Sequence, residues 1–292
     1  MGPLQDKVGL HKINAMKDFF ADIPFIGDFF EQHPKVAVIR LSGVIADAGM
    51  RKGGISHAQV AEQIDRAFDM KDVREIAVII NSPGGAPAQC SLIATQIRDR
   101  AHDKKVPVTV FIEDVAASGG YWLACVADKI YVQGSSIVGS IGVISAGFGF
   151  EEFIKRFDIR RRVHTSGKDK AMLDPFLPEK KSDVERLSKL QNDIHAQFIE
   201  WVRARRGDRL KGADEDLFEG HIWSGQGALS VGLADALGDM RGVMRDKYGE
   251  KVRLIELEPE KPFWQSVLGV KLNNSGLTAE LENRAFWTRF GL

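Results

Sequence analysis

One serine in this chain stands where its hydroxyl could act as a nucleophile. Ser118 follows an apolar, strand-like run at residues 106–112 and precedes a helix-like run at residues 121–127. A helix N-terminus offers unpaired N–H groups and the positive end of the helix dipole. The N–H of Gly119 could therefore face the oxygen that becomes negative when Ser118 attacks a carbonyl carbon. The alternative is that Ser118 only caps the helix and that its glycines only allow close packing.

Two other glycine-rich turns follow predicted strands. The Pro-Gly-Gly turn at residues 83–85 frees backbone N–H groups at the start of a helix, where they could supply a second oxyanion donor opposite Gly119. A tight turn without a ligand is the competing interpretation. The third turn, at residues 134–142, is rich in glycine and serine. All three turns thus fall at strand ends, where open α/β sheets place their sites.

A serine nucleophile also needs a base to take its proton. Histidine is the usual base, but no histidine lies in a comparable turn, and we interpret the nearest one, His164, as structural. A lysine can serve only in its neutral form, so burial must lower its pKa from about 10.4 to about 7–8. Lys170 is followed by Ala-Met-Leu at residues 171–173, which could shield it from water. The alternative is that Lys170 is an ordinary solvated lysine.

The elements that would position these groups alternate between strands and helices. Such alternation predicts βαβ units with parallel strands and right-handed crossovers. A helix is predicted over about residues 87–104, and a capping box of Ser182 and Glu185 opens a second, long helix. Apolar runs predict strands over residues 35–41, 75–80, 106–112, 129–132 and 252–257, and residues 160–165 are also strand-like.

This pattern predicts one α/β domain, residues 35–258, with an arm at each end. The N-terminal arm, residues 1–34, is amphipathic, and the C-terminal arm covers residues 259–292. The arms carry more large apolar side chains than one domain can easily bury, so we expect them to pack against sister subunits or a membrane surface. These side chains are Phe19, Phe20, Phe25, Phe29, Phe30, Phe263, Trp264, Phe286 and Trp287.

Composition argues against several classes of protein. Of the 292 residues, 40 are basic and 40 are acidic, so the net charge of zero gives no reason to expect a nucleic-acid partner. The two cysteines, Cys90 and Cys125, lie in apolar runs and are predicted to be buried free thiols. The seven histidines form no HxxxH pair, and neither GxxxxGK[ST] nor GxGxxG opens a helix. We therefore predict no metal and no other cofactor.

Membrane contact is a separate question. No apolar run reaches the roughly 18–20 residues needed to cross a bilayer, and no signal peptide opens the chain. Residues 15–31 carry five phenylalanines between acidic residues, a pattern that could lie on a membrane, on the chain's own domain or on another subunit. We expect a cytoplasmic protein, with peripheral contact to the inner membrane as an open alternative.

Five short motifs occur in order along the chain. They are Asn-Ser-Pro-Gly-Gly at 81–85, Ala-Ser-Gly-Gly-Tyr at 117–121, Gly-Ser-Ile-Gly-Val at 139–143, Ser-Gly-x-x-Lys at 166–170, and Trp-Ser-Gly-x-x-Ala at 223–228 with Gly-Leu-Ala-Asp at 232–235. Together they resemble the signal peptide peptidase A family of serine peptidases, which has the ClpP/crotonase fold. The resemblance runs from about Val36 to Gly238 and is to the short members with a single catalytic domain. Each motif alone is weakly specific, but five in the same order are a strong signal.

The resemblance implies a role for each matching residue. Ser118 would be the nucleophile and Lys170 the general base, whereas Lys168 matches a variable position. Ser140 would hydrogen-bond the amine of Lys170, although a turn serine that caps backbone groups is the alternative. Asp169 stands where an aromatic residue is common in the family, and its charge would favour a protonated Lys170 if it pointed inward. We expect Asp169 to point outward.

The same resemblance implies the oxyanion donors and the activity. The donors would be the N–H groups of Gly119 and Gly85, with Gly84 as the alternative to Gly85. The implied activity is that of a serine endopeptidase with a Ser-Lys dyad, which cleaves extended hydrophobic peptides such as signal-peptide remnants. The family's usual N-terminal membrane anchor has no counterpart in this sequence.

The resemblance also implies a homo-oligomer. Short members of the family form ring-like oligomers in which the lysine reaches the serine of the next subunit, and we expect shared sites here too. Two alternatives to the peptidase stay open: a crotonase-type acyl-CoA enzyme with the same fold, and an inactive membrane-associated scaffold.

Overall fold

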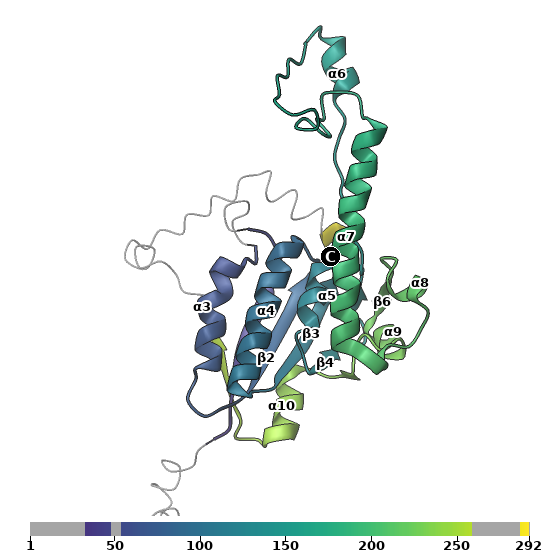
Figure 1. Cartoon of the computed structure of the whole chain (residues 1–292). Coiled ribbons are helices and arrows are strands. Elements are labelled where there is room, and N and C mark those ends of the chain that lie inside the picture. Colours follow the sequence, from purple (N-terminus) through teal and green to yellow (C-terminus); the bar gives the residue numbers. More distant parts are fainter. Residues whose placement is uncertain (1–32, 48–53, 259–286, 292) are drawn as a thin grey trace, which may run out of the picture.

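A sheet of mostly parallel strands forms the body of the molecule (Figure 1). The computed structural model describes residues 33–47, 54–258 and 287–291. The predicted arms therefore lie almost wholly outside the described residues, and so do all the large apolar side chains named above except Trp287.

Within the described residues the sheet has eight strands. Its main path runs β6-β5-β3-β2-β1-β8, while β4 pairs with β3 and β7 pairs with β4. Neighbouring strands are parallel except β5 and β6, so the predicted α/β fold with parallel strands is confirmed. The strands are β1 (Lys35–Ser42), β2 (Val73–Ser82), β3 (Val108–Ala117), β4 (Lys129–Val132), β5 (Ile137–Gly139), β6 (Ile222–Ser224), β7 (Ala236–Leu237) and β8 (Arg253–Leu257).

Helices cover both faces of the sheet, which explains why its central strands are nearly continuous apolar runs. One face packs against α3 (His57–Phe68), α4 (Pro87–Lys104), α5 (Gly119–Ala124) and part of α7 (Lys181–Arg206) (Figure 1). The other face packs against α10 (Met240–Tyr248), whose Met244 is fully buried. The remaining helices are α6 (Glu151–Arg156), the 3₁₀ helix η1 (Gly207–Arg209), α8 (Asp214–Leu217) and α9 (Gly225–Ser230).

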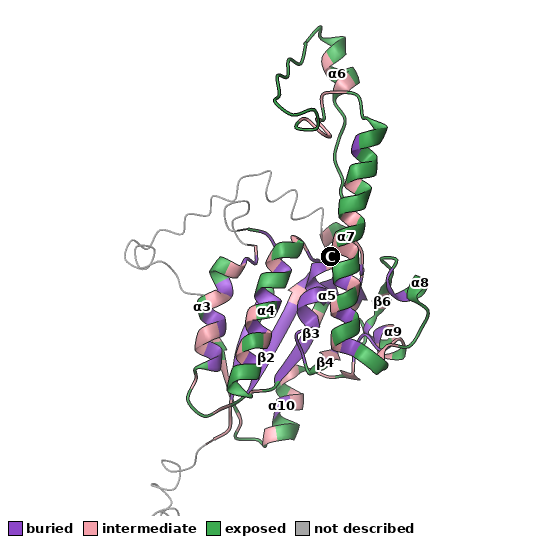
Figure 2. Cartoon of the chain, viewed as in Figure 1, coloured by how far each residue is buried: buried purple, intermediate pink, exposed green. Residues whose placement is uncertain are grey.

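One segment leaves the body altogether. Residues 146–180, which we call the α6 arm, stand at the N-terminal end of α7 and away from the sheet (Figure 1). Figure 2 shows the contrast in burial, since the strands are buried while the arm and the first half of α7 are mostly exposed. The long helix α7 thus joins two parts of the molecule that have very different surroundings.

Two local predictions are wrong. Residues 160–165 form no strand, because they lie in the α6 arm with no neighbouring strand to pair with. The long helix does not begin with a Ser182 capping box: α7 starts at Lys181, Lys180 occupies the N-cap position, and the Ser182 hydroxyl bonds the carboxylate of Asp183 instead.

Candidate active site

Ser118 lies at the strand-to-helix turn that the sequence predicts. It follows β3, which ends at Ala117, and precedes α5, which begins at Gly119. Its backbone has φ 51° and ψ −122°, and its side chain makes no capping hydrogen bond to the helix. A helix N-cap has an extended backbone and a side chain that accepts from the first turn, so capping does not account for this serine. A non-glycine residue held in such a sparsely populated conformation is instead typical of functional sites.

The turn at Pro83–Gly85 packs directly against Ser118. A Cβ placed on Gly84 would lie 2.8 Å from Ser118 Cβ and 2.9 Å from Gly119 N, so only glycine allows this approach. A Cβ placed on Gly119 would lie 3.2 Å from Gly85 N, so the two turns are in close contact here. The predicted meeting of these two turns is therefore present in the structure.

The hydrogen bonds of this turn separate the two candidate donors. Gly84 N–H donates to Ser82 Oγ at 3.2 Å. The bridge to Ile45 uses Gly84 C=O and Ala86 N–H, each at 2.8 Å. These bonds leave the Gly85 N–H without an acceptor among the described residues, which favours Gly85 over Gly84 as an oxyanion donor.

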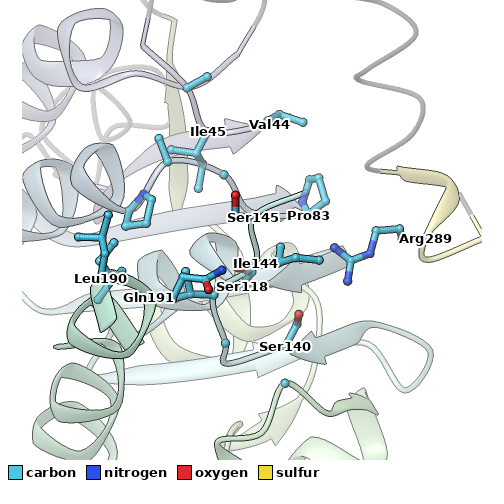
Figure 3. A pocket seen from close by; sticks show the side chains of 18 of the residues that line it. Val44, Ile45, Pro83, Ser118, Ser140, Ile144, Ser145, Leu190, Gln191 and Arg289 are labelled. Carbon is cyan, nitrogen blue, oxygen red and sulfur yellow. The ribbon is translucent and has the colours of Figure 1, made fainter. Parts of the chain in front are cut away.

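The third turn completes the group. Ser118 N–H donates to Gly139 C=O at 2.8 Å, and the next residue, Ser140, is fixed by a bond from its N–H to His221 C=O. Ser140 and Ser118 line the same cleft (Figure 3). The structure thus brings together Ser118, Ser140 and the two glycine turns that the sequence singles out.

The cleft in front of Ser118 has a volume of about 710 Å³ and mostly apolar walls. Side chains on one face of α7 contribute to it, and the sequence pattern did not predict this part of the cleft. Their helical spacing marks an apolar face, but it cannot tell a face buried in the core from a cleft wall. The wall residues of α7 are Leu187, Leu190, Gln191 and Ile194, with Val44, Ile45, Ile144 and Phe290 among the others (Figure 3).

Lys170 does not lie in this cleft. It sits in the α6 arm, exposed to solvent, as does Lys168. The prediction that residues 171–173 shield Lys170 from water is therefore wrong within one chain. Asp169 pairs with Arg186 on α7 at 3.0 Å, so its carboxylate is engaged on the arm side. One chain brings Ser118 together with the candidate oxyanion donors, and it places Lys170 elsewhere.

The two thiols offer no competing nucleophile. Burial raises the pKa of Cys90 and of Cys125 to about 12, and both are free, as predicted. Only a thiolate is a good nucleophile, so both cysteines are inert at neutral pH. Cys90 lies close to Gly119, where a Cβ on Gly119 would come within 2.6 Å of its Sγ.

A strained serine beside two close backbone N–H groups at the end of a parallel strand is the arrangement of an α/β serine hydrolase. Comparison with known proteins narrows this class. The model of peptidase family S49 matches residues 100–251, just over half of the chain. The chain therefore belongs to peptidase family S49, a family of serine peptidases, as the resemblance in the sequence implies.

Individual relatives have several names. A Na(+)/H(+) antiporter NhaA of Brucella abortus is 44% identical over 88% of this chain and 37% of its own length. Protease 4 of Haemophilus influenzae is 29% identical over 76% of this chain and 35% of its own. A chloroplastic serine protease SPPA of Arabidopsis thaliana is 28% identical over 85% of this chain and 39% of its own. The chain thus spans little more than a third of the length of these relatives.

The described part of the chain contains no helix that is both long and apolar enough to cross a membrane.

Proposed function

We propose that this chain is a serine endopeptidase that cleaves extended hydrophobic peptides, such as remnants of signal peptides, with Ser118 as nucleophile and Lys170 as base. The observation that carries the proposal is the strained Ser118 in the wall of an apolar cleft, close to the backbone of Gly119 and Gly85. Apolar walls favour substrates whose side chains lose water on binding.

The chemistry follows from the position of each group. Ser118 Oγ attacks a peptide carbonyl carbon and gives its proton to the neutral amine of Lys170. The N–H groups of Gly119 and Gly85 bind the oxyanion that forms. The C–N bond then breaks as the Lys170 ammonium protonates the leaving amine. A water molecule next gives a proton to Lys170 and attacks the ester carbon, which releases the acid and returns the proton to Ser118. Ser140, beside Ser118 in the cleft, would orient the lysine amine.

Lys170 would come from a second copy of the chain. In one chain the α6 arm holds Lys170 away from the cleft and exposes a set of apolar side chains. Soluble proteins rarely leave such a set in water, so its burial against a second copy is favourable. The exposed fractions are 82% for Phe148, 58% for Phe153, 62% for Phe157 and 57% for Ile159.

Such docking would also change the state of the lysine. A solvated lysine is protonated at neutral pH and cannot accept a proton. Inside an apolar cleft the charged form loses its hydration, so the neutral amine becomes available. Assembly would therefore create the base as well as position it.

Replacement of the nucleophile tests this function. Ser118→Ala should keep the fold and the assembly, lose covalent labelling by a fluorophosphonate, and lose at least about a thousandfold in peptidase activity. The measurements are labelling and mass spectrometry of peptide-library digests. Ser91→Ala, at an exposed position on α4, is the matched control and should behave as wild type. Activity of Ser118→Ala within a few-fold of wild type would show that another residue is the nucleophile.

A further inference from the structure

The helix that follows Ser118 is too weak to fix its own direction. α5 has six residues, and its first two are glycines. Short helices are marginal on their own, and glycine adds to the cost of helix formation. Yet α5 must hold the Gly119 N–H steady, because that group is an oxyanion donor in the proposed function, on which this inference rests. Contacts from outside the helix must supply the rigidity.

The hydrogen-bond register at the other end of α5 leaves one carbonyl without a backbone donor. Cys125 N–H donates to Tyr121 C=O at 3.0 Å, and Val126 N–H donates to Leu123 C=O at 3.1 Å. The register therefore skips the carbonyl of Trp122, a residue that is only 7% exposed. A buried carbonyl without a donor is costly, so it needs a partner from another element.

That partner comes from α7. The indole Nε1 of Trp201 donates to Trp122 C=O at 2.9 Å. Three residues before Trp201 on α7, Phe198 stacks on the Trp122 ring with ring centroids 4.8 Å apart. Arg205, one turn after Trp201, donates to Cys125 C=O at 2.9 Å and Ala127 C=O at 3.0 Å. The stack sets how close the two helices lie, whereas the directional bonds set how α5 is rotated about its axis.

We propose that Trp201 is a positioning residue for the peptidase site, supported by Arg205. Its indole N–H holds the carbonyl end of α5, which fixes the helix axis and hence the direction of the Gly119 N–H at the opposite end. Trp201 does not line the cleft, so it acts through α5 and not on the substrate. Loss of its bond lets α5 rotate and misdirects an oxyanion donor, which weakens binding of the transition state more than binding of the substrate.

Trp201→Phe tests this role, because phenylalanine keeps an aromatic ring at the position and removes only the donor. We expect kcat to fall about tenfold with KM within about twofold, since full loss of an oxyanion donor costs more than a misdirected one. The rate of fluorophosphonate labelling at Ser118 should fall in parallel. Trp201→His, which restores a ring N–H, should recover part of the lost kcat.

Two controls separate positioning from general stability. Arg203→Gln lies on the same helix, where Arg203 pairs with Asp214, and should leave kcat unchanged. Phe198→Leu removes the ring stack but keeps the indole bond, so it should lower the thermal midpoint more than it lowers kcat. Folding of each variant is checked by circular dichroism, and kinetics are measured well below the thermal midpoint.

The outcomes are decisive in each case. A folded Trp201→Phe protein with kcat within twofold of wild type overturns the proposal. Should Trp201→Phe not fold, Arg205→Gln takes its place, and an unchanged kcat there overturns the proposal equally. Failure of the proposed function is seen separately, because wild type would then show no labelling at Ser118.

Discussion

The turn around Ser118 is enclosed by packed backbone, whereas the α6 arm keeps most of its apolar side chains in water. Gly84 approaches Ser118 so closely that a Cβ would clash, and neighbouring residues such as Tyr121 are fully buried. In the arm, Phe148 and Phe157 are more than half exposed. The difference shows that one chain packs the residues around Ser118 by itself, whereas the arm that carries Lys170 keeps apolar side chains uncovered. In the proposed function a second copy of the chain covers these side chains and receives Lys170.

Lys247 in the body and Lys170 in the arm differ in the contacts of their amines. Lys247 lies against Glu75, whose buried carboxylate also accepts from Tyr248, each at 2.7 Å. Burial alone would lower the pKa of Lys247, but the hydrogen bond and charge of Glu75 outweigh it and raise that pKa above the ordinary value. Such a lysine stays protonated and cannot act as a base. Lys170 lies exposed in the α6 arm, and the proposed function needs its amine without a carboxylate partner of this kind.

The largest expected effect concerns the arm lysines. Lys170→Ala should be about as damaging as Ser118→Ala, and the double variant little worse, because a nucleophile and its base act as a unit. Lys168→Ala is the matched control, two residues away in the same exposed loop, and should stay close to wild type. Both are measured as kcat/KM on one apolar peptide. A dead Lys168→Ala with an active Lys170→Ala would shift the assignment of the base by two residues.

A smaller but more specific effect on activity is expected when the Ser118 variant and the Lys170 variant are mixed. Ser118→Ala and Lys170→Ala proteins, each inactive alone, should regain activity when they are refolded together. In a random equal mixture about one interface in four joins an intact Ser118 to an intact Lys170, so recovery should approach about a quarter of wild type. Native mass spectrometry must show that mixed oligomers form. Mixed oligomers without activity would mean that the dyad closes within one chain.

The sequence was sufficient to predict the body of the fold but not the placement of the arm. β1, β2 and β3 are long apolar runs, so their existence and their parallel pairing could be predicted. β6 and β7 have three and two residues, too few to show any periodicity. Residues 160–165 have strand-like composition, yet a strand also needs a neighbour, and composition does not reveal one.

The candidate site, like the fold, could be predicted from the sequence only in part. The turn at Ser118 could be predicted because a strand, a helix and their glycines are local features of the sequence. The choice between Gly84 and Gly85 depends on a bond to Ser82 Oγ and a bridge to Ile45, which no local pattern shows. The position of Lys170 depends on where a protruding segment points, and residues 171–173 look the same in sequence whether they cover the lysine or not.

The smallest expected effect concerns the buried ion pair of Asp235 and Arg206 in the body. Asp235 accepts from Arg206 through both carboxylate oxygens at 2.9 and 3.0 Å and from Ile130 N–H at 2.7 Å, and Arg206 is only 2% exposed. Burial alone would raise the pKa of Asp235, but these hydrogen bonds and the charge of Arg206 lower it below the ordinary value. A lowered pKa stabilises the fold above the unfolded-state value of about 3.9, and this contribution is lost as the pH falls through the folded-state value.

Asp235→Asn should therefore destabilise the body at pH 7 by about 3 kcal/mol, because it leaves the buried guanidinium of Arg206 without its counter-charge. The deficit should shrink as the pH falls below the unfolded-state value of about 3.9, because the wild-type carboxyl then takes up its proton and loses the same contribution. Free energies of unfolding from urea titrations at pH 7, 5 and 3 measure both effects. Asp193→Asn, at an exposed position on α7, should match wild type at every pH. A constant deficit at all three pH values would show that Asp235 acts by shape and hydrogen bonding alone, and that its charge contributes nothing to holding Arg206 in the body.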